Sequence, residues 1–417
     1  MSRLQAEHVY KVFGRRPEEA VRRLEDGAGR DELRAEGTTA AVIDASFSVD
    51  EGQIFVVMGL SGSGKSTLLR TLNGLLEPTA GSVRFDGQDL TSLTAKELRA
   101  VRSEKISMVF QHFALFPHRS VLENAAYGLQ VRGVPRAERQ RRATEALELA
   151  GLKGWEKSWP DELSGGMQQR VGLARALATD ADLLLMDESF SALDPLIRRD
   201  MQDQLLELQK TLKKTIVFIT HDLNEAMRLG DRIAVMRDGR IVQNGTAEDI
   251  LLRPANDYVA SFIQDVDRSR VLTAGAVMAR PDTVLGTAAA DGRVLATAAD
   301  LLAAAPATVR PDTPVAELFA PCASPVPVAV TDASGALVGA VTAAGLLAAL
   351  GEPAGRAELP RRVRTTRGGT SGPSAAGPAA ARQDSDKPGG TTPDAAHQPG
   401  TPGRASQAEQ GKVSAGA

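Results

Sequence analysis

A glycine-rich loop that follows a wholly apolar run constrains the fold of this chain more than any other feature. The run is Ile54–Met58, and the loop reads Gly59-Leu60-Ser61-Gly62-Ser63-Gly64-Lys65-Ser66-Thr67. Such a run is typical of a parallel strand that is buried on both faces. The glycines allow a tight turn with inward N–H groups, and a helix from Ser66 onward adds its positive end. The sequence therefore predicts an α/β domain with a phosphate-binding loop.

The residue types in this loop each have a chemical use. Lys65 is expected to reach the β- and γ-phosphates of a nucleotide, and the Ser66 hydroxyl is expected to ligate Mg²⁺. The alternative is a surface turn with a chance lysine, which the complete pattern after a buried strand disfavours. The predicted nucleotide-binding positions are Gly59, Ser61, Gly62, Ser63, Gly64, Lys65, Ser66 and Thr67.

A second apolar run, Leu183–Met186, ends in two acids, Asp187 and Glu188. Acids at the carboxyl end of a buried strand lie where open α/β sheets bind their ligands. Alone, such a pair is as often an ordinary solvated strand end. Beside a phosphate loop, Asp187 is expected to hold the Mg²⁺ shell and Glu188 to polarise the attacking water as general base.

A third element, between the loop and the acids, reads Leu163-Ser164-Gly165-Gly166-Met167-Gln168-Gln169-Arg170. Ser164, Gly165 and Gly166 precede a plausible helix over 167–178. A serine hydroxyl and two glycine N–H groups at a helix start would form a second anion site. Two phosphate-binding elements in one chain are puzzling if both serve the same nucleotide.

In this order, the three elements resemble the ATP-binding cassette, the ATPase of membrane transporters. The resemblance implies a P-loop NTPase with a mixed sheet core and a helical signature subdomain, which uses ATP and Mg²⁺. It also implies that two copies of the chain pack head to tail and that each signature closes over the partner's ATP. Asp194, in Ser191-Ala192-Leu193-Asp194, resembles the D-loop at that dimer seam. The signature residues would be Ser164, Gly165, Gly166 and Gln168.

Single residues receive roles from the same resemblance. Gln111, after Met108-Val109-Phe110, resembles the Q-loop glutamine, which contacts Mg²⁺ and the attacking water and links the ATP site to the transporter. His221 resembles the switch histidine, which hydrogen-bonds the γ-phosphate. Phe13 resembles the aromatic residue on which adenine stacks, and Tyr10 is a possible substitute. A lone glutamine or histidine at a strand end is usually structural, so these roles depend on the spacing between motifs.

Composition bounds the class of protein. The net charge of −3 gives no overall basic footprint, so nucleic acid is not an expected partner. The single cysteine, Cys322, excludes an internal disulfide and fits a reducing compartment. The N-terminus does not resemble a signal peptide, and no apolar run reaches the roughly 18 residues of a spanning helix. With the cassette resemblance, we expect a peripheral protein on the cytoplasmic face of the membrane. Its partners would be a membrane-spanning permease and, indirectly, an extracytoplasmic solute-binding protein.

Composition also changes along the chain. Residues 1–265 carry the strand and helix alternation of the cassette domain, whereas 266–350 are rich in Ala, Val and Leu with few charges. Residues 351–417 are dominated by Pro, Gly, Ser, Thr and Ala. Such a segment cannot bury enough apolar surface to offset its ordering entropy, so we predict a disordered tail.

The 266–350 segment contains a weak internal duplication. Residues 326–342 read as strand, turn and strand, and Ala343–Leu350 reads as a helix. This unit resembles the second half of a cystathionine-synthase-type (CBS) domain, a small α+β fold, and residues 291–302 look like a degenerate partner. In that family, Thr/Ser-x-x-Asp touches the ribose of an adenosine ligand. Thr297-Ala298-Ala299-Asp300 keeps the pattern, whereas Thr342-Ala343-Ala344-Gly345 lacks the acid. A packing domain without a ligand is the alternative.

A charged insertion follows Phe13, and Arg16–Leu24 within it reads as the start of an amphipathic helix. Together with the run Asp187–Arg198 and the CBS-type unit, the insertion makes the chain similar to the ATPase of glycine betaine/proline (quaternary amine) importers. The resemblance implies that ATP hydrolysis powers import of an osmoprotectant. An importer for another solute, such as an amino acid or a choline-like compound, is an alternative. A soluble cassette ATPase in DNA repair or translation is a third. No residue here is expected to touch the solute, so the substrate is inferred by analogy.

Overall fold

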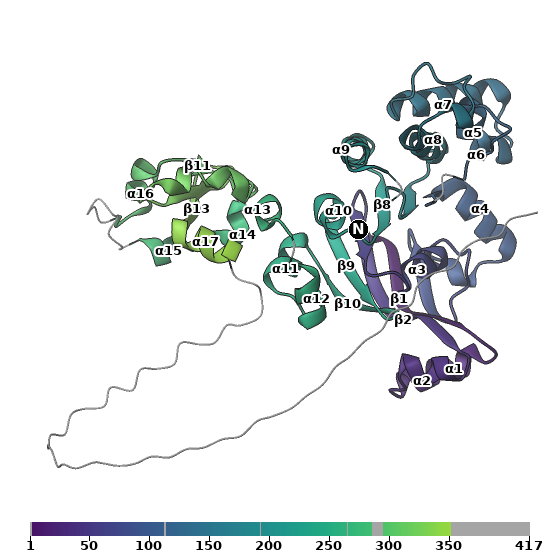
Figure 1. The fold of residues 1–417 in the computed structure, drawn as a ribbon, viewed down its shortest axis with the longest axis horizontal. Helices are drawn as coiled ribbons and strands as arrows, with labels where there is room; N and C mark the ends of the chain where they lie inside the picture. Colours follow the sequence, from purple (N-terminus) through teal and green to yellow (C-terminus); the bar gives the residue numbers. More distant parts are fainter. Residues whose placement is uncertain (1, 112–113, 192, 265, 286–294, 352–417) are drawn as a thin grey trace, which may run out of the picture. The chain divides into compact units, whose positions relative to one another are not determined.

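Buried apolar strands build the central sheet of the cassette domain, as the sequence predicts (Figure 1). The computed structural model describes residues 2–111, 114–191, 193–264, 266–285 and 295–351. The sheet has six strands in the order β10-β9-β3-β8-β7-β6. Neighbouring strands are parallel except β9 and β10, so the predicted mixed sheet is confirmed. The strands are β3 Ile54–Met58, β6 Ile106–Val109, β7 Leu183–Asp187, β8 Thr215–Thr220, β9 Arg232–Arg237 and β10 Arg240–Gly245.

A second, antiparallel sheet packs on this one and encloses the helix that follows the phosphate loop. Its order is β2-β1-β4-β5, with β1 Ser2–Phe13, β2 Thr39–Asp50, β4 Ala80–Phe85 and β5 Gln88–Asp89. Phe47 of β2 stacks on Phe55 of β3 with 4.7 Å between ring centroids. Helix α3 (Lys65–Leu72) contributes Leu68, Leu69 and Leu72 to the same apolar cluster. The phosphate loop is therefore fixed to a buried apolar cluster that both sheets share.

The charged insertion forms two short helices, α1 (Pro17–Glu25) and α2 (Arg30–Ala35). Pro17 suits the first turn of α1 because that position needs no backbone donor. Apolar residues of α1 pack on Tyr10 and other buried side chains of β1 and β2, so the predicted amphipathic helix is confirmed.

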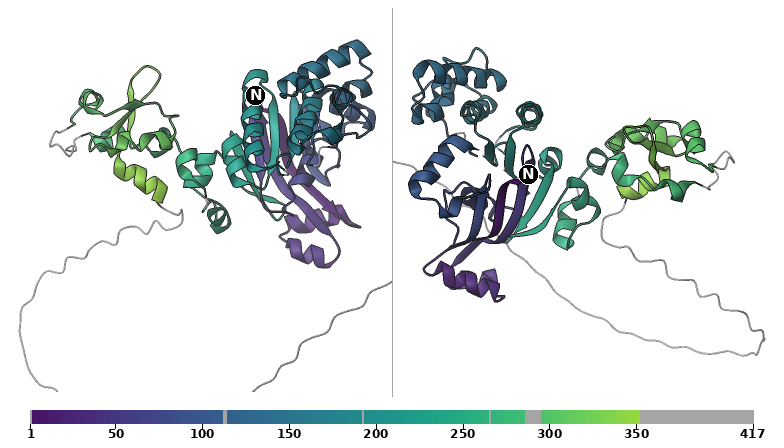
Figure 2. Two further views of the ribbon diagram at one scale, coloured as in Figure 1. Left: turned by 45° about the horizontal axis from the view of Figure 1, so that its top comes forward. Right: turned by 180° about the vertical axis from the view of Figure 1, so that it is seen from behind.

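Helices α5 (Val121–Ala125), α6 (Tyr127–Val131), α7 (Arg136–Leu149) and α8 (Gly165–Ala178) share a separate apolar cluster. Figure 2 shows them gathered beside the central sheet, as expected of a helical signature subdomain. Helix α8 begins at Gly165, earlier than the predicted start, because the Ser164 hydroxyl caps it by accepting the Met167 N–H at 3.3 Å. The remaining cassette helices are α4 Ala95–Lys105, α9 Pro195–Leu212 and α10 Leu223–Leu229, with the 3₁₀ turns η1 Leu90–Ser92 and η2 Pro160–Glu162.

Three short helices lead from β10 towards the C-terminal region: α11 (Ala247–Leu252), α12 (Asp257–Phe262) and α13 (Arg268–Val271). The Glu248 carboxylate on α11 accepts hydrogen bonds from the Thr273 N–H at 3.2 Å and the Thr273 hydroxyl at 2.6 Å. The chain just after α13 is thus anchored to α11. None of the described helices is long and apolar enough to cross a bilayer.

The C-terminal region has the predicted strand, turn, strand and helix: β12 (Val328–Thr331), β13 (Leu337–Val341) and α17 (Ala343–Gly351). Cys322 is buried against β13, and burial raises the pKa of its thiol. Residues 286–294 lie outside the described residues, and so does the predicted tail apart from Gly351, which ends α17. The other elements are α14 Ala274–Val277, α15 Pro281–Val284, α16 Ala298–Ala304, β11 Thr308–Val309, η3 Val315–Leu318 and η4 Pro321–Ala323.

Candidate functional site

The phosphate loop joins β3 to α3 and depends on glycine for two different reasons. Gly59, Gly62 and Gly64 have φ values of 154°, 78° and 104°, where other residues are strained. A Cβ atom on Gly64 would lie 2.1 Å from the Ala41 carbonyl oxygen, and one on Gly59 would lie 2.2 Å from that of Met236. Close approach of β2 and β9 therefore fixes Gly59 and Gly64, beyond the tight turn expected from the sequence.

The Lys65 ammonium group lies inside this loop. The side chain is only 4% exposed, and its Nζ donates hydrogen bonds to the carbonyls of Gly59 at 2.8 Å and Leu60 at 3.1 Å. The same Nζ lies 3.4 Å from Glu188 Oε1. A buried ammonium at the start of α3 adds to the positive end of the helix, which favours a bound anion.

Asp187 and Ser66 present adjacent oxygen atoms beside the lysine. The Ser66 hydroxyl donates to Asp187 Oδ1 at 2.8 Å, and Asp187 is buried at the end of β7. Burial raises the pKa of Asp187, while the hydrogen bond from Ser66 acts in the opposite direction. Hydroxyl and carboxylate oxygens suit Mg²⁺, and a cation would offset the burial of the charged carboxylate. The residues present therefore fit the predicted magnesium site.

Glu188 lies between the predicted phosphate-binding lysine and the predicted switch histidine. Its Oε2 is 3.0 Å from Nδ1 of His221, and its Oε1 faces Lys65. Its φ of 42° is left-handed, and its N–H donates to the Ile219 carbonyl at 3.0 Å. This bond ties the turn after β7 to β8 and explains how a strained backbone persists there. Residues that follow the ends of β3, β7 and β8 thus converge at one place.

The signature residues and Asp194 lie at the starts of α8 and α9. Ser164 and Gly165 are exposed, but Gly166 is buried, and a Cβ there would lie 2.5 Å from Ile197 Cγ2. Gly166 is therefore needed for packing of α8 on α9, a reason that the sequence did not reveal. Gln168 Nε2 donates to the carbonyls of Pro160 at 2.9 Å and Leu163 at 3.3 Å, while Asp194 Oδ1 caps α9.

The structure distinguishes the two candidate adenine platforms. Phe13 is 42% exposed at the end of β1, with Lys11 Nζ 5.3 Å from its ring centroid. Tyr10 is 6% exposed, covered by the charged insertion, and so offers no free ring face. Gln111 is half-buried and follows β6, next to residues 112–113, which are not described.

The charged insertion also contacts the phosphate loop, which sequence reasoning missed. Arg30 of α2 donates to Asp238 Oδ1 at 3.0 Å and to the Gly62 carbonyl at 3.3 Å. The only signal in the sequence was the density of charge, which does not identify a partner so distant along the chain.

The Thr-x-x-Asp pattern in the C-terminal region has a local structural use. Asp300 Oδ2 accepts hydrogen bonds from the N–H and the hydroxyl of Thr297, both at 2.8 Å. The Thr297 hydroxyl in turn accepts from the Asp300 N–H at 3.2 Å. This reciprocal capping box starts α16. The pattern therefore has a use that needs no adenosine ligand.

A phosphate loop on a mixed sheet, an acidic strand end beside it and a capped signature helix together define an ATP-binding cassette ATPase. Residues 42–191 match the ABC transporter family. The chain is 59% identical over 283 residues to the glycine betaine transport ATP-binding protein of Bacillus subtilis, which covers 68% of each chain. It is 57% identical over 285 residues to the glycine betaine/carnitine transport ATP-binding protein of Listeria monocytogenes, or 68% of this chain and 72% of that one.

Two further comparisons agree. The chain is 54% identical over 273 residues to the glycine betaine/proline betaine transport system ATP-binding protein of Escherichia coli, or 65% of this chain and 68% of that one. The dimeric structure of a bacterial ABC transporter cassette superposes with a TM-score of 0.50 and 33% identity, over 58% of this chain and 98% of that chain. The chain therefore belongs to the ABC transporter family, as one of its ATP-binding, ATP-hydrolysing cassette proteins.

Proposed function

We propose that this chain is the ATP-hydrolysing subunit of an importer for a quaternary amine osmoprotectant, with glycine betaine as the first candidate solute. The observation that supports hydrolysis is the placement of Glu188, which contacts both Lys65 and His221. The solute class rests on relatives with 54–59% identity, whose names specify glycine betaine transport. Import of an amino acid is the alternative, and the transport assay below distinguishes the two.

The geometry suggests how the site works. Lys65 and the glycine loop would bind the nucleotide phosphates. Ser66, Asp187 and Gln111 would hold Mg²⁺, which would supply positive charge against the phosphates. Lys65 Nζ lies 3.4 Å from Glu188 Oε1. A bound phosphate would share this lysine, and the Glu188 carboxylate would then accept a proton from the attacking water.

The remaining site residues act between two copies of the chain. Ser164 and Gly165 are exposed, so they are available to a nucleotide on a partner subunit. Asp194 lies at the start of α9, where it contributes to the same seam. The solved relative is a dimer, which supports a head-to-tail pair with composite ATP sites. A peripheral location at the cytoplasmic membrane face follows from an importer ATPase.

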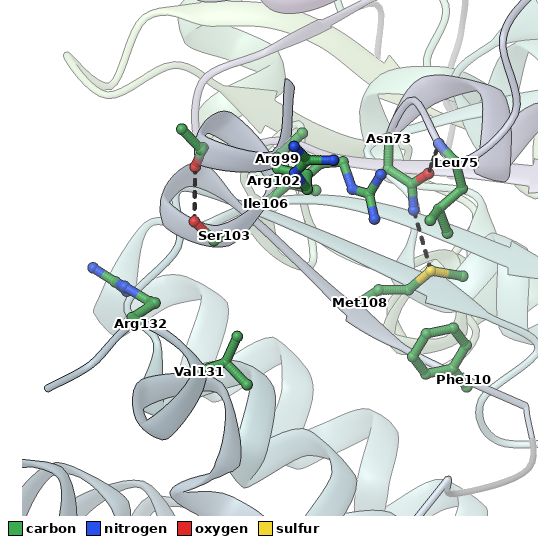
Figure 3. Close-up of a pocket in the computed structure, with 11 residues that line it drawn as sticks. Asn73, Leu75, Arg99, Arg102, Ser103, Ile106, Met108, Phe110, Val131 and Arg132 are labelled. Atoms are coloured by element: carbon green, nitrogen blue, oxygen red, sulfur yellow. Dashed lines mark hydrogen bonds between the residues drawn. The ribbon is translucent and has the colours of Figure 1, made fainter. Parts of the chain in front are cut away.

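A groove beside the Gln111 loop suits a contact with the permease. Figure 3 shows its lining residues, which come from α4 and β6 on one side and α6 on the other. The volume of the groove is about 520 Å³. Val131 is 66% exposed within it, and Leu75 and Phe110 also present apolar surface. An exposed apolar groove with a basic rim fits a short segment of a partner protein. The basic residues are Arg99, Arg102 and Arg132.

For the C-terminal region, we propose a CBS-type pair over 266–350. The order of β12, β13 and α17 supports the second half of that pair. The support for an adenosine ligand is weaker, because the Asp300 side chain already caps α16.

The test is to purify the chain with its multi-spanning permease and reconstitute both in vesicles. ATP hydrolysis and uptake of labelled glycine betaine should rise together when the solute-binding protein is added, and Lys65→Ala should remove both. Proline, carnitine, choline and an amino acid are compared in parallel. If hydrolysis accompanies uptake of another solute instead, glycine betaine is not the substrate and that solute takes its place. If no permease copurifies with the chain, the transporter role is wrong.

A further inference from the structure

Arg198, on the first turns of α9, contacts two loops that carry predicted catalytic residues. Its Nη2 donates to the backbone carbonyls of Leu193 at 3.1 Å and Ser191 at 3.4 Å. Its Nη1 lies 3.2 Å from Asp222 Oδ2. Arg198 belongs to none of the predicted nucleotide-binding or catalytic positions.

Each of these loops is in turn bonded to a residue at the reaction centre. The Ser191 hydroxyl donates to the backbone carbonyl of Glu188 at 2.8 Å. Asp222 directly follows His221, whose ring nitrogen is 3.0 Å from the Glu188 carboxylate. Arg198 therefore closes a ring of contacts that runs from Glu188 through Ser191 to Asp222 and His221.

The two carboxylate oxygens of Asp222 have separate partners. Oδ1 accepts the N–H groups of Asn224 at 2.9 Å and Glu225 at 3.2 Å, and so caps α10. Oδ2 is left to face Arg198. The aspartate thus fixes the end of the His221 loop to α10 with one oxygen and to α9 with the other.

We propose that Arg198 is a positioning residue for ATP hydrolysis: it holds the His221 loop against the segment that follows Glu188. A planar guanidinium suits this task because its rigid fork can reach two backbone carbonyls and a carboxylate together. The pair is only 27% and 32% exposed, so it is screened less than a fully exposed ion pair. Asp194 caps the same helix, so Arg198 also connects the dimer seam to the catalytic carboxylate.

The inference rests on the proposed ATPase function and is tested by hydrolysis in the assembled transporter. Arg198→Ala should lower kcat by about 10- to 100-fold, as expected when reacting groups lose alignment. The KM for ATP should change less than about twofold, because the phosphate loop is untouched. Arg198→Lys should recover part of kcat. The matched control is Arg199→Ala, on the exposed neighbouring position of α9.

Asp222→Asn is a second, independent variant, because asparagine can still cap α10 while losing the charge that faces Arg198. Asp222→Asn should also lower kcat with little change in the KM for ATP. In the double variant with Arg198→Ala, kcat should fall little further. If both single variants retain the kcat of Arg199→Ala, or if kcat falls only together with the melting temperature, the inference is wrong. If the wild-type transporter does not hydrolyse ATP, the proposed function itself fails.

Discussion

The glycines of the phosphate loop allow a prediction that can be worked out from the structure. Gly62 has a φ of 78° with no atom near its added Cβ, so Gly62→Ala carries only the left-handed penalty, about 1–2 kcal/mol. Gly64 has a φ of 104°, and its added Cβ would lie 2.1 Å from the Ala41 oxygen, against 3.4 Å for ordinary contact. The backbone must move by more than an ångström. We expect Gly64→Ala to cost about 2–5 kcal/mol, from about 1–2 kcal/mol for the left-handed backbone and about 1–3 kcal/mol for the overpacking.

The same movement would displace Lys65, the next residue. The affinity of Gly64→Ala for ATP should therefore fall by about 10- to 100-fold, whereas that of Gly62→Ala should fall much less. The loss of stability is measured by denaturant unfolding of both variants. Equal slopes would show that both unfold in the same transition. Equilibrium binding of a fluorescent ATP analogue measures the loss of affinity. Equal losses of stability, or a greater loss in Gly62→Ala, would refute the argument from close backbone contact.

Three further predictions concern other parts of the chain. Glu188→Gln should retain ATP binding but lower kcat by about 10²- to 10⁴-fold in a steady-state assay, because it removes the general base. In mixed dimers, Ser164→Arg and Lys65→Ala on separate chains should leave one composite site active. Both changes on one chain, paired with wild type, should damage both sites, and equal hydrolysis by the two mixtures would contradict shared sites. In the C-terminal region, Thr297→Ala and Asp300→Ala should lower thermal stability to a similar extent, because each removes half of one capping box. If Asp300 served only to contact a ribose, replacing it would leave the thermal stability unchanged.

Much of the central sheet could be predicted because its strands are buried on both faces. Runs such as Leu183–Asp187 show this burial directly in their composition, and parallel strands end at one edge of the sheet. Convergence of Lys65, Asp187, Glu188 and His221 follows from that rule, although their individual roles remain predictions.

Other features could not be predicted from local pattern. The exposure of Phe13 and the burial of Tyr10 depend on irregular register in β1, where bulges break simple alternation. Arg198 and Arg30 acquire their partners through tertiary packing, for which a single sequence carries no signal. The Thr297 to Asp300 pattern was ambiguous for a different reason: one spacing serves both a ligand contact and a helix cap.

The burial of Cys322 has a practical consequence for measuring motion. It is the only thiol in the chain, and it is buried in the C-terminal region. Burial also raises the pKa of the thiol, which disfavours the reactive thiolate. A cysteine introduced at an exposed position near the seam, such as Leu196→Cys, should react with a maleimide dye first, since Leu196 is 78% exposed. Two labelled copies could then report opening and closing by energy transfer, with the native thiol left in place.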